Sequence, residues 1–246
     1  MNKPFLILQL RANDKASNNE FEAFLEFGGL KEEEVHRVRM ESEEFPEIDL
    51  DQYSGVIVGG GESNVSDAES DKPVFQVAFE QNLLVLLEDI YERDFPFLGA
   101  CYGHGILGKY LGVDVSKVCF SEEAGAGTIM LRPEANGDPV LEGVPDNFRA
   151  FLGHKESWQA VPDGVQLLAS TEICPVHMVK VKENIYATQF HPELDIEGVV
   201  LRIGIYNNAG YFDPEKAEEL IDSVRQERII YPMVILKNFV DRYKQK

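Results

Sequence analysis

The chain has 246 residues, of which 44% are hydrophobic and 27% charged, a composition typical of globular proteins. Its 43 acidic residues outnumber its 23 basic ones, giving a net charge of −20. This charge repels phosphate backbones and anionic membranes, so we expect neither nucleic acid nor a membrane surface as a partner. No apolar run approaches the roughly 20 residues that a membrane-spanning helix requires.

Strands alternate with helices through the first half of the chain. Apolar runs predict buried strands at 5–10, 55–58 and 95–100, and alternating apolar and polar residues predict a strand at 35–40. A capping-box pattern at 17–20 predicts a helix that ends at Gly28-Gly29, and further helices are predicted at 74–92 and from 106 onward. This βαβα order predicts an α/β fold with a mostly parallel central sheet and helices on both faces.

The second half of the chain has a different character. Short strand candidates occur at 127–131, 148–153, 165–170, 178–181 and 185–190, and turn signals separate them. We expect them to form an antiparallel extension at one edge of the same sheet. Helical patterns return at 213–216 and 232–243. No linker or internal repeat is evident, so a single domain spanning 1–246 is predicted.

Cys101 lies in the most informative segment, the apolar run 95–100 followed by Cys-Tyr-Gly-His. Gly99 and Gly103 flank it at −2 and +2, where missing Cβ atoms permit a sharp strand-to-helix turn with one side chain at its apex. A thiol at a helix N-terminus is favoured as thiolate by the helix dipole. The pattern therefore predicts a nucleophilic cysteine.

A second segment, Thr-Gln-Phe-His-Pro-Glu at 188–193, supplies a candidate base. Residues two apart in an extended segment point to the same side, so Glu193 is expected to orient His191. The glycines at 59–61 follow a buried strand and are candidates for an oxyanion hole. Cys119 and Cys174 lack such surroundings and are predicted to be structural.

The other histidines carry weaker signals. His104 lies one turn beyond Cys101 and either packs or contacts substrate, whereas His154 follows a strand candidate and is placed at the border of the cleft. His36 and His177 are predicted at the surface or at a sheet edge. The three cysteines match neither a metal-binding spacing nor a disulfide framework, which fits a reducing compartment, and we expect a cytoplasmic protein.

The segments 99–104 and 189–193 together resemble the class I (triad-type) glutamine amidotransferase family, whose fold is flavodoxin-like. Residues 58–63 resemble the family's oxyanion strand, and 153–162 resemble the matching stretch of GMP synthase glutaminase domains. The resemblance covers about residues 4–193 and the final helix. It implies a free-standing member with no attached synthetase domain.

The resemblance implies that Cys101 attacks the side-chain amide of glutamine, giving a γ-glutamyl thioester and ammonia, with His191 as base and Glu193 as its orienter. The backbone N–H groups of Gly60 and Tyr102 would form the oxyanion hole. Further candidate substrate contacts are Gly61, Gly103, His104, Ser157 and Trp158. The expected partners are glutamine or another γ-glutamyl small molecule and a synthase subunit that accepts the ammonia; no metal or organic cofactor is implied.

The chain departs from the family pattern in two places. Gly105 stands where the family commonly has a substrate-holding glutamine, and residues 196–228 are predicted to be a helical insertion that covers the cleft, docks a partner or is purely structural. One alternative is a γ-glutamyl peptidase, slightly favoured because Gly105 would open space beside the nucleophile. The other is a non-catalytic regulatory protein, against which the intact cysteine, histidine and glutamate argue.

Overall fold

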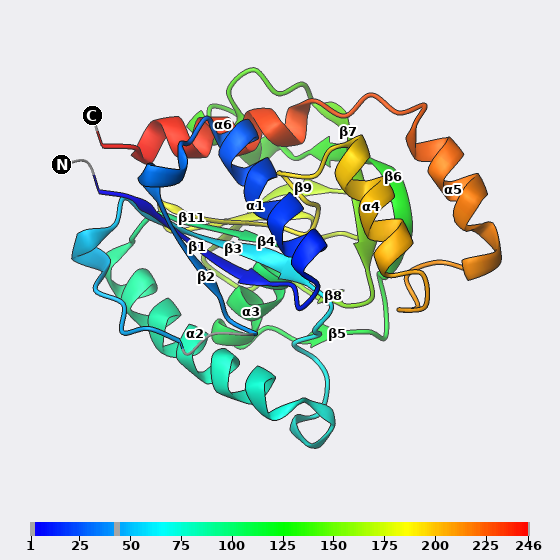
Figure 1. The fold of residues 1–246 in the computed structure, drawn as a ribbon. Coiled ribbons are helices and arrows are strands. Elements are labelled where there is room, and N and C mark those ends of the chain that lie inside the picture. The colour runs from blue at the N-terminus through cyan, green and yellow to red at the C-terminus, as the bar shows by residue number, and fades with distance from the viewer. Residues whose placement is uncertain (1–2, 42–44, 246) are drawn as a thin grey trace.

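A nine-stranded mixed sheet forms the centre of the computed structural model, which describes residues 3–41 and 45–245 (Figure 1). Its strand order is β2-β1-β3-β4-β11-β10-β9-β6-β7. The strands of this sheet are β1 (Phe5–Leu10), β2 (Val35–Arg39), β3 (Gly55–Gly61), β4 (Phe97–Ala100), β6 (Glu122–Leu131), β7 (Asn147–His154), β9 (Val165–Ser170), β10 (Met178–Val181) and β11 (Ile185–Thr188). The short strands β5 (Val115–Ser116) and β8 (Ser157–Trp158) pair with each other separately.

The sheet has a parallel half and an antiparallel half. Strands β2, β1, β3, β4 and β11 run parallel, and the pairings from β11 through β10, β9 and β6 to β7 are antiparallel. The predicted α/β class, parallel core and antiparallel edge extension are therefore confirmed. Because β11 pairs with β4, the segment after β11 begins beside the segment after β4.

Helices cover both faces of the parallel half (Figure 1). Side chains alternate along β1, so that Leu6 and Leu8 share a core with α2 and α3, while Phe5 and Ile7 share one with α1 and α6. The helices are α1 (Asp14–Gly28), α2 (Val74–Arg93), α3 (Tyr102–Tyr110), α4 (Ile196–Ile205), α5 (Ala217–Val224) and α6 (Tyr231–Tyr243). In the part of the chain that the structure describes, no helix is both long and apolar enough to cross a bilayer.

The start of α1 differs from the prediction. The N-cap is Asn13, whose side chain accepts hydrogen bonds from the backbone N–H groups of Lys15 and Ala16 at 3.0 and 3.2 Å. Ser17, expected to cap the helix, lies inside its first turns and is buried. The predicted stop is correct, because Gly29 adopts the left-handed conformation with φ 65°.

The segment 196–228 forms α4, a 3₁₀ turn at Pro214–Lys216 and α5. These helices share a small core with β7 through Phe151, Val199, Ile203 and Val224. Figure 1 shows them at the antiparallel end of the sheet, with α5 beside β6. That this segment is an insertion relative to the family, and that 1–246 is a single domain, stay predictions.

Candidate active site

Cys101 occupies a sharp turn between β4 and α3. Its backbone has φ 50° and ψ −90°, a conformation that is costly for any residue with a Cβ atom. A Cβ on Gly99 would lie 2.6 Å from the backbone of Gly103, and one on Gly103 would lie 2.7 Å from the carbonyl oxygen of Val58. The two glycines thus let strand and helix touch, as the sequence predicted, and the turn projects the thiol away from the sheet.

The parallel pairing of β4 with β11 brings the two sequence motifs together. Ala100 lies opposite Thr188, and the backbone N–H of Cys101 donates to the Thr188 carbonyl oxygen at 2.7 Å. Gln189 follows, with its Nε2 3.9 Å from the Cys101 sulfur. His191 then lines the same cavity as Cys101. Residues ninety positions apart in sequence therefore share one site.

His191 and Glu193 are directly hydrogen-bonded. Nδ1 of His191 lies 3.0 Å from Oε1 of Glu193, and Glu193 has no exposed surface. Nη1 of Arg202 also lies 3.3 Å from this nitrogen, but the nearer partner is a carboxylate, which only accepts when ionised, so we assign the proton to Nδ1 and the lone pair to Nε2. Burial lowers the pKa of His191 despite the opposing effect of Glu193, so the imidazole is held in the neutral form that a general base requires.

Two buried arginines, which the sequence analysis did not identify, surround this pair. Arg202 donates to Oε1 of Glu193 at 3.0 Å and lies 3.7 Å from Glu20. Arg11 donates to Glu20 at 2.6 Å. Burial opposes ionisation of Glu193, yet His191 and these arginines hold the pKa of its carboxyl well below the usual range. The two guanidinium groups therefore keep Glu193 ionised beside a second buried carboxylate.

The Cys101 thiol does not have the lowered pKa that the sequence suggested. Burial raises the pKa of this thiol to about 12, and the attraction of Arg11 does not offset the effect. Loss of hydration thus outweighs the attraction of the nearby arginines. The raised pKa favours a protonated thiol in the cavity that it shares with His191, so we expect the thiol proton to be removed during the chemical step.

The cavity at Cys101 has two lobes. The larger, with about 560 Å³ of empty volume open to solvent, is lined partly by Arg11, His191, Tyr206 and Phe212. The smaller, of about 310 Å³, is lined partly by Ser63, Tyr102, His154 and Gln189. Cys101, Gly61, Gly153 and Tyr211 border both lobes. The 206–211 segment therefore lines the cleft, one of the roles considered for it.

The glycines at 59–61, which end β3, have distinct surroundings. A Cβ on Gly60 would overlap Cε1 of His191, so the absence of a side chain there lets the imidazole approach the strand. Gly61 borders the cavity. The run belongs to β3 itself, which extends to Gly61 and not only to residue 58 as predicted. Gly60 and the backbone of Tyr102 thus flank the site from two elements.

Four of the candidate substrate contacts lie in the packed interior and not among the residues that line the cavity: Gly103, His104, Ser157 and Trp158. The Trp158 indole is fully buried and donates to the His104 carbonyl oxygen at 2.9 Å. The His104 ring is stacked on it, with ring centroids 4.7 Å apart. These side chains pack α3 against β8 because they fill the space behind the nucleophile.

Gly105 borders the smaller lobe of the cavity at Cys101, as the sequence suggested. A Cβ there would lie 3.2 Å from both Oε1 of Glu156 and Cγ2 of Val65. The Glu156 carboxylate accepts from the backbone N–H groups of Val65 and Ser66, each at 2.8 Å. Gly105, Glu156 and Cys101 all line the smaller lobe, so a glycine at 105 leaves space there that a side chain would reduce.

Two histidine predictions have different outcomes. His154 borders the smaller lobe, as predicted. His177 was predicted at the surface or an edge but has no exposed surface, because its ring contacts Glu122 and is stacked on Phe190.

The family model for class I glutamine amidotransferases matches residues 15–198, three quarters of the chain and the whole region that carries Cys101, His191 and Glu193. The chain belongs to this family. The amidotransferase is 32% identical over 141 residues to a glutamine-hydrolysing GMP synthase of Caldicellulosiruptor saccharolyticus, covering 57% of this chain and 24% of that protein. It is 36% identical over 102 residues to a glutamine-hydrolysing GMP synthase subunit from Methanococcus maripaludis, covering 41% of this chain and 52% of the relative.

Solved structures agree with the fold of this amidotransferase. A glutamine amidotransferase of Thermotoga maritima superposes with a TM-score of 0.76 at 20% identity, covering 97% of both chains. One from Methylobacillus flagellatus gives 0.74 at 20% identity, covering 100% of this chain and 97% of that one. The chain spans about a quarter to a half of the length of the curated relatives named above, so their complete activities do not transfer with the fold.

Proposed function

We propose that this amidotransferase hydrolyses the side-chain amide of glutamine, with Cys101 as nucleophile, His191 as general base and acid, and Glu193 as the group that orients His191. The observation that carries the proposal is the shared cavity: Cys101 and His191 line it together, and His191 is held by Glu193 at 3.0 Å. A nucleophile, a base and an orienting carboxylate in this order are the parts that acyl transfer through a thioester needs.

The reaction balances without any cofactor. Nε2 of His191 takes the thiol proton while the sulfur of Cys101 bonds to the amide carbon. The tetrahedral intermediate then breaks its C–N bond as His191 returns the proton to nitrogen, which releases ammonia and leaves a γ-glutamyl thioester. His191 next takes a proton from water, whose oxygen attacks the thioester carbon. Collapse of the second intermediate releases glutamate, and the proton goes back to sulfur.

The raised pKa of the thiol makes this coupled proton transfer necessary. The oxyanion of each intermediate would be stabilised by the backbone N–H groups of Tyr102, the first residue of α3, and Gly60, whose Cα lies against His191. Removing one such donor costs about 3 kcal/mol in other hydrolases.

The ammonia would pass to a separate synthase subunit. The support is the similarity to the Methanococcus maripaludis protein, which is named as one subunit of a GMP synthase, a name that implies a partner. This part of the proposal concerns the acceptor and leaves the chemistry at Cys101 unchanged.

The test is to assay ammonia release from glutamine by the purified protein, with Cys101→Ala as the inactive variant and Cys119→Ala as the matched control. Cys119 is an exposed free cysteine, so its loss should change nothing. An electrophilic glutamine analogue should alkylate Cys101 and no other cysteine, even when no partner is present. Failure of both the assay and the labelling would overturn the proposal.

A γ-glutamyl peptidase remains the second candidate, because the cavity has two lobes that meet at Cys101. A leaving group as small as ammonia needs only one of them. Cleavage of γ-glutamyl dipeptides at a higher kcat/KM than glutamine would replace the first proposal with this one, while the roles of the three side chains would stay the same.

A further inference from the structure

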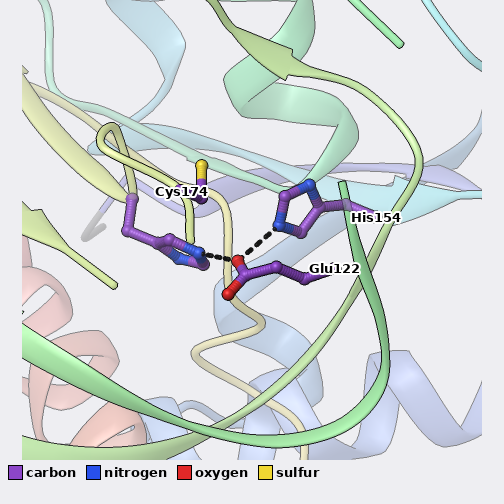
Figure 2. A group of neighbouring side chains, drawn as sticks. Glu122, His154 and Cys174 are labelled. Atoms are coloured by element: carbon purple, nitrogen blue, oxygen red, sulfur yellow. Dashed lines mark hydrogen bonds and ion pairs between the residues drawn. The ribbon is translucent and has the colours of Figure 1, made fainter. Parts of the chain in front are cut away.

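Four potential metal ligands converge behind the active-site cavity. Glu122 is the first residue of β6, His154 is the last residue of β7, and Cys174 and His177 lie in the loop between β9 and β10. One donor atom from each side chain lies within 4.8 Å of all the others. Figure 2 shows the carboxylate of Glu122 and the ring of His154 directed toward one another, with the sulfur of Cys174 nearby.

One carboxylate oxygen faces both imidazole rings. Oε2 of Glu122 lies 2.9 Å from Nε2 of His154 and 2.5 Å from Nε2 of His177. Nδ1 of His154 lies 3.0 Å from the carbonyl oxygen of Glu156, which only accepts, so Nδ1 carries the proton of a neutral ring. The lone pair on Nε2 then points at a carboxylate oxygen. Such a pair requires a cation, either a proton or a metal ion, between the two atoms.

The surroundings supply no other positive charge. Among residues 3–41 and 45–245, Glu122 makes no ion pair with a lysine or an arginine. Within the same residues, Nδ1 of His177 is buried without a hydrogen-bond partner. The sulfur of Cys174 makes a long contact of 3.6 Å to the Val176 carbonyl oxygen and also interacts with the Ser157 side chain, neither of which carries a positive charge. A buried set of two imidazoles, a thiol and a carboxylate without a balancing side chain is costly in the absence of a cation.

We propose that Glu122, His154, Cys174 and His177 bind a divalent transition metal ion, with Zn²⁺ as the best fit. Two nitrogens, one sulfur and one oxygen form a four-coordinate donor set typical of tetrahedral zinc. Bond lengths of about 2.0 Å to nitrogen and oxygen at the tetrahedral angle place these donors about 3.3 Å apart. The distances from Oε2 of Glu122 to the rings of His154 and His177 would therefore lengthen by less than about 1 Å on binding. Side-chain rotation can supply a change of this size.

Partners beyond the ligands are already arranged for such a site. The Glu156 carbonyl oxygen fixes the tautomer of His154, and Oγ1 of Thr171 donates to the other carboxylate oxygen of Glu122 at 2.8 Å. Ligand orientation by carbonyl and hydroxyl groups of this kind is usual around bound metals. All four positions would be filled by protein, which indicates a structural ion and not a catalytic one.

The position of the site would let the ion hold in place the segment that precedes His191. The carbonyl oxygen of His177 accepts the backbone N–H of Gln189 at 2.8 Å, and the His177 ring is stacked on Phe190 with centroids 6.3 Å apart. Both contacts lie immediately before His191. The ion would thus join β6, β7 and the β9–β10 loop to the segment that positions His191. The metal site itself does not depend on the proposed function.

The experiment is a Co²⁺ titration of the full-length chain after metal removal by a chelator, in a Cys101→Ala background that eliminates the other thiol near a histidine. We expect one equivalent to bind, with intense visible bands from tetrahedral cobalt and a sulfur-to-cobalt charge-transfer band. Cys174→Ser should abolish the charge-transfer band and weaken binding by more than about 100-fold. Cys119→Ser is the matched control and should leave both unchanged.

Two results would overturn the proposal. The first is a folded metal-free protein, checked by circular dichroism, that binds no Co²⁺ or Zn²⁺. The second is a cobalt spectrum unaffected by Cys174→Ser, which would place any bound ion elsewhere. Should Cys174→Ser fail to fold, His177→Gln with the thiol retained serves instead, and it must weaken binding and alter the visible bands for the proposal to stand. Neither readout requires enzymatic activity.

Discussion

Replacement of Arg202 by methionine should disrupt both the stability and the pH dependence of this amidotransferase. The guanidinium of Arg202 is 8% exposed and donates to Glu193 at 3.0 Å, and it also lies 3.7 Å from Glu20. Arg202→Met keeps most of the side-chain volume but leaves two buried carboxylates with Arg11 as their remaining arginine. The variant therefore isolates the charge of Arg202 from its packing.

The expected cost follows from burial. Breaking a buried ion pair by removing one partner costs about 3–5 kcal/mol, because the other charge stays buried and uncompensated. The matched control is Arg149→Met, which removes a pair with Glu227 whose side chains are 38% and 24% exposed. A pair that exposed contributes about 1 kcal/mol or less. Urea unfolding monitored by circular dichroism at neutral pH measures both values.

The effect on stability should itself depend on pH. Glu193 has a lowered pKa in the folded protein, so its ionisation stabilises the fold above the ordinary glutamate pKa and this contribution is lost as the pH falls below about 4.3. Arg202→Met raises the pKa of Glu193 and removes part of that contribution. The difference in unfolding free energy between wild type and variant should therefore shrink as the pH falls through this range.

The pH dependence of activity should also change in Arg202→Met. Arg202 is one of the groups that lower the pKa of His191. Without it the pKa of His191 rises, and because the base must be neutral, the acid limb of kcat/KM moves to higher pH. Arg202→Lys, which restores the charge, should return the limb toward the wild-type position. An Arg202→Met enzyme with an unshifted acid limb and a cost within 1 kcal/mol would refute the electrostatic argument.

Three further predictions concern Gly60 in β3, the Cys101 thiol and the packing of Trp158 against α3. Gly60→Ala should lower kcat/KM by about 100-fold, since the added methyl overlaps His191 and misplaces the base; steady-state kinetics measures this. Alkylation of Cys101 by iodoacetamide should be slow at pH 7 and accelerate throughout the alkaline range, because burial raises the pKa of the thiol to about 12. Trp158→Phe should cost about 1 kcal/mol of stability or more with an unchanged KM, since it removes the buried indole hydrogen bond to the His104 carbonyl oxygen.

The first two of these predictions have a control within the same molecule, and the third has an outcome that would contradict it. Gly204→Ala adds a methyl where no atom lies within 4 Å and should leave kinetics unchanged, so equal losses at positions 60 and 204 would contradict the steric argument. The exposed Cys119 should be alkylated before Cys101; the reverse order at neutral pH would indicate a thiolate–imidazolium pair at rest. A higher KM in Trp158→Phe would restore Trp158 as a substrate contact.

Local patterns were sufficient to predict most of the fold. Apolar runs located the strands of the sheet, and the alternation of strands and helices predicted its parallel half. The capping prediction at Ser17 was wrong because two sites with capping residues lie four positions apart, and Asn13 captures two backbone N–H groups. The two-residue strands β5 and β8 were missed because their pairing depends on tertiary contacts that short segments do not encode.

The site was only partly predictable. Cys101, His191 and Glu193 stand in two compact motifs, and the pairing of β4 with β11 brings those motifs together. Arg11 and Arg202 carry no local signal, because an arginine after a strand or inside a helix is ordinary in sequence. The four candidate metal ligands escaped detection for the same reason: they come from three separate segments and have no recognisable spacing.

The arginines also explain how so acidic a chain can keep its orienting carboxylate ionised. Two carboxylates buried together, here Glu20 and Glu193, would ordinarily force one to take up a proton. A protonated Glu193 would no longer hold the imidazolium that forms when His191 accepts the thiol proton. Arg11 and Arg202 balance the two buried charges locally, within a chain whose net charge is −20. Since Arg202 comes from α4, the segment 196–228 supplies part of the electrostatics on which the proposed chemistry depends.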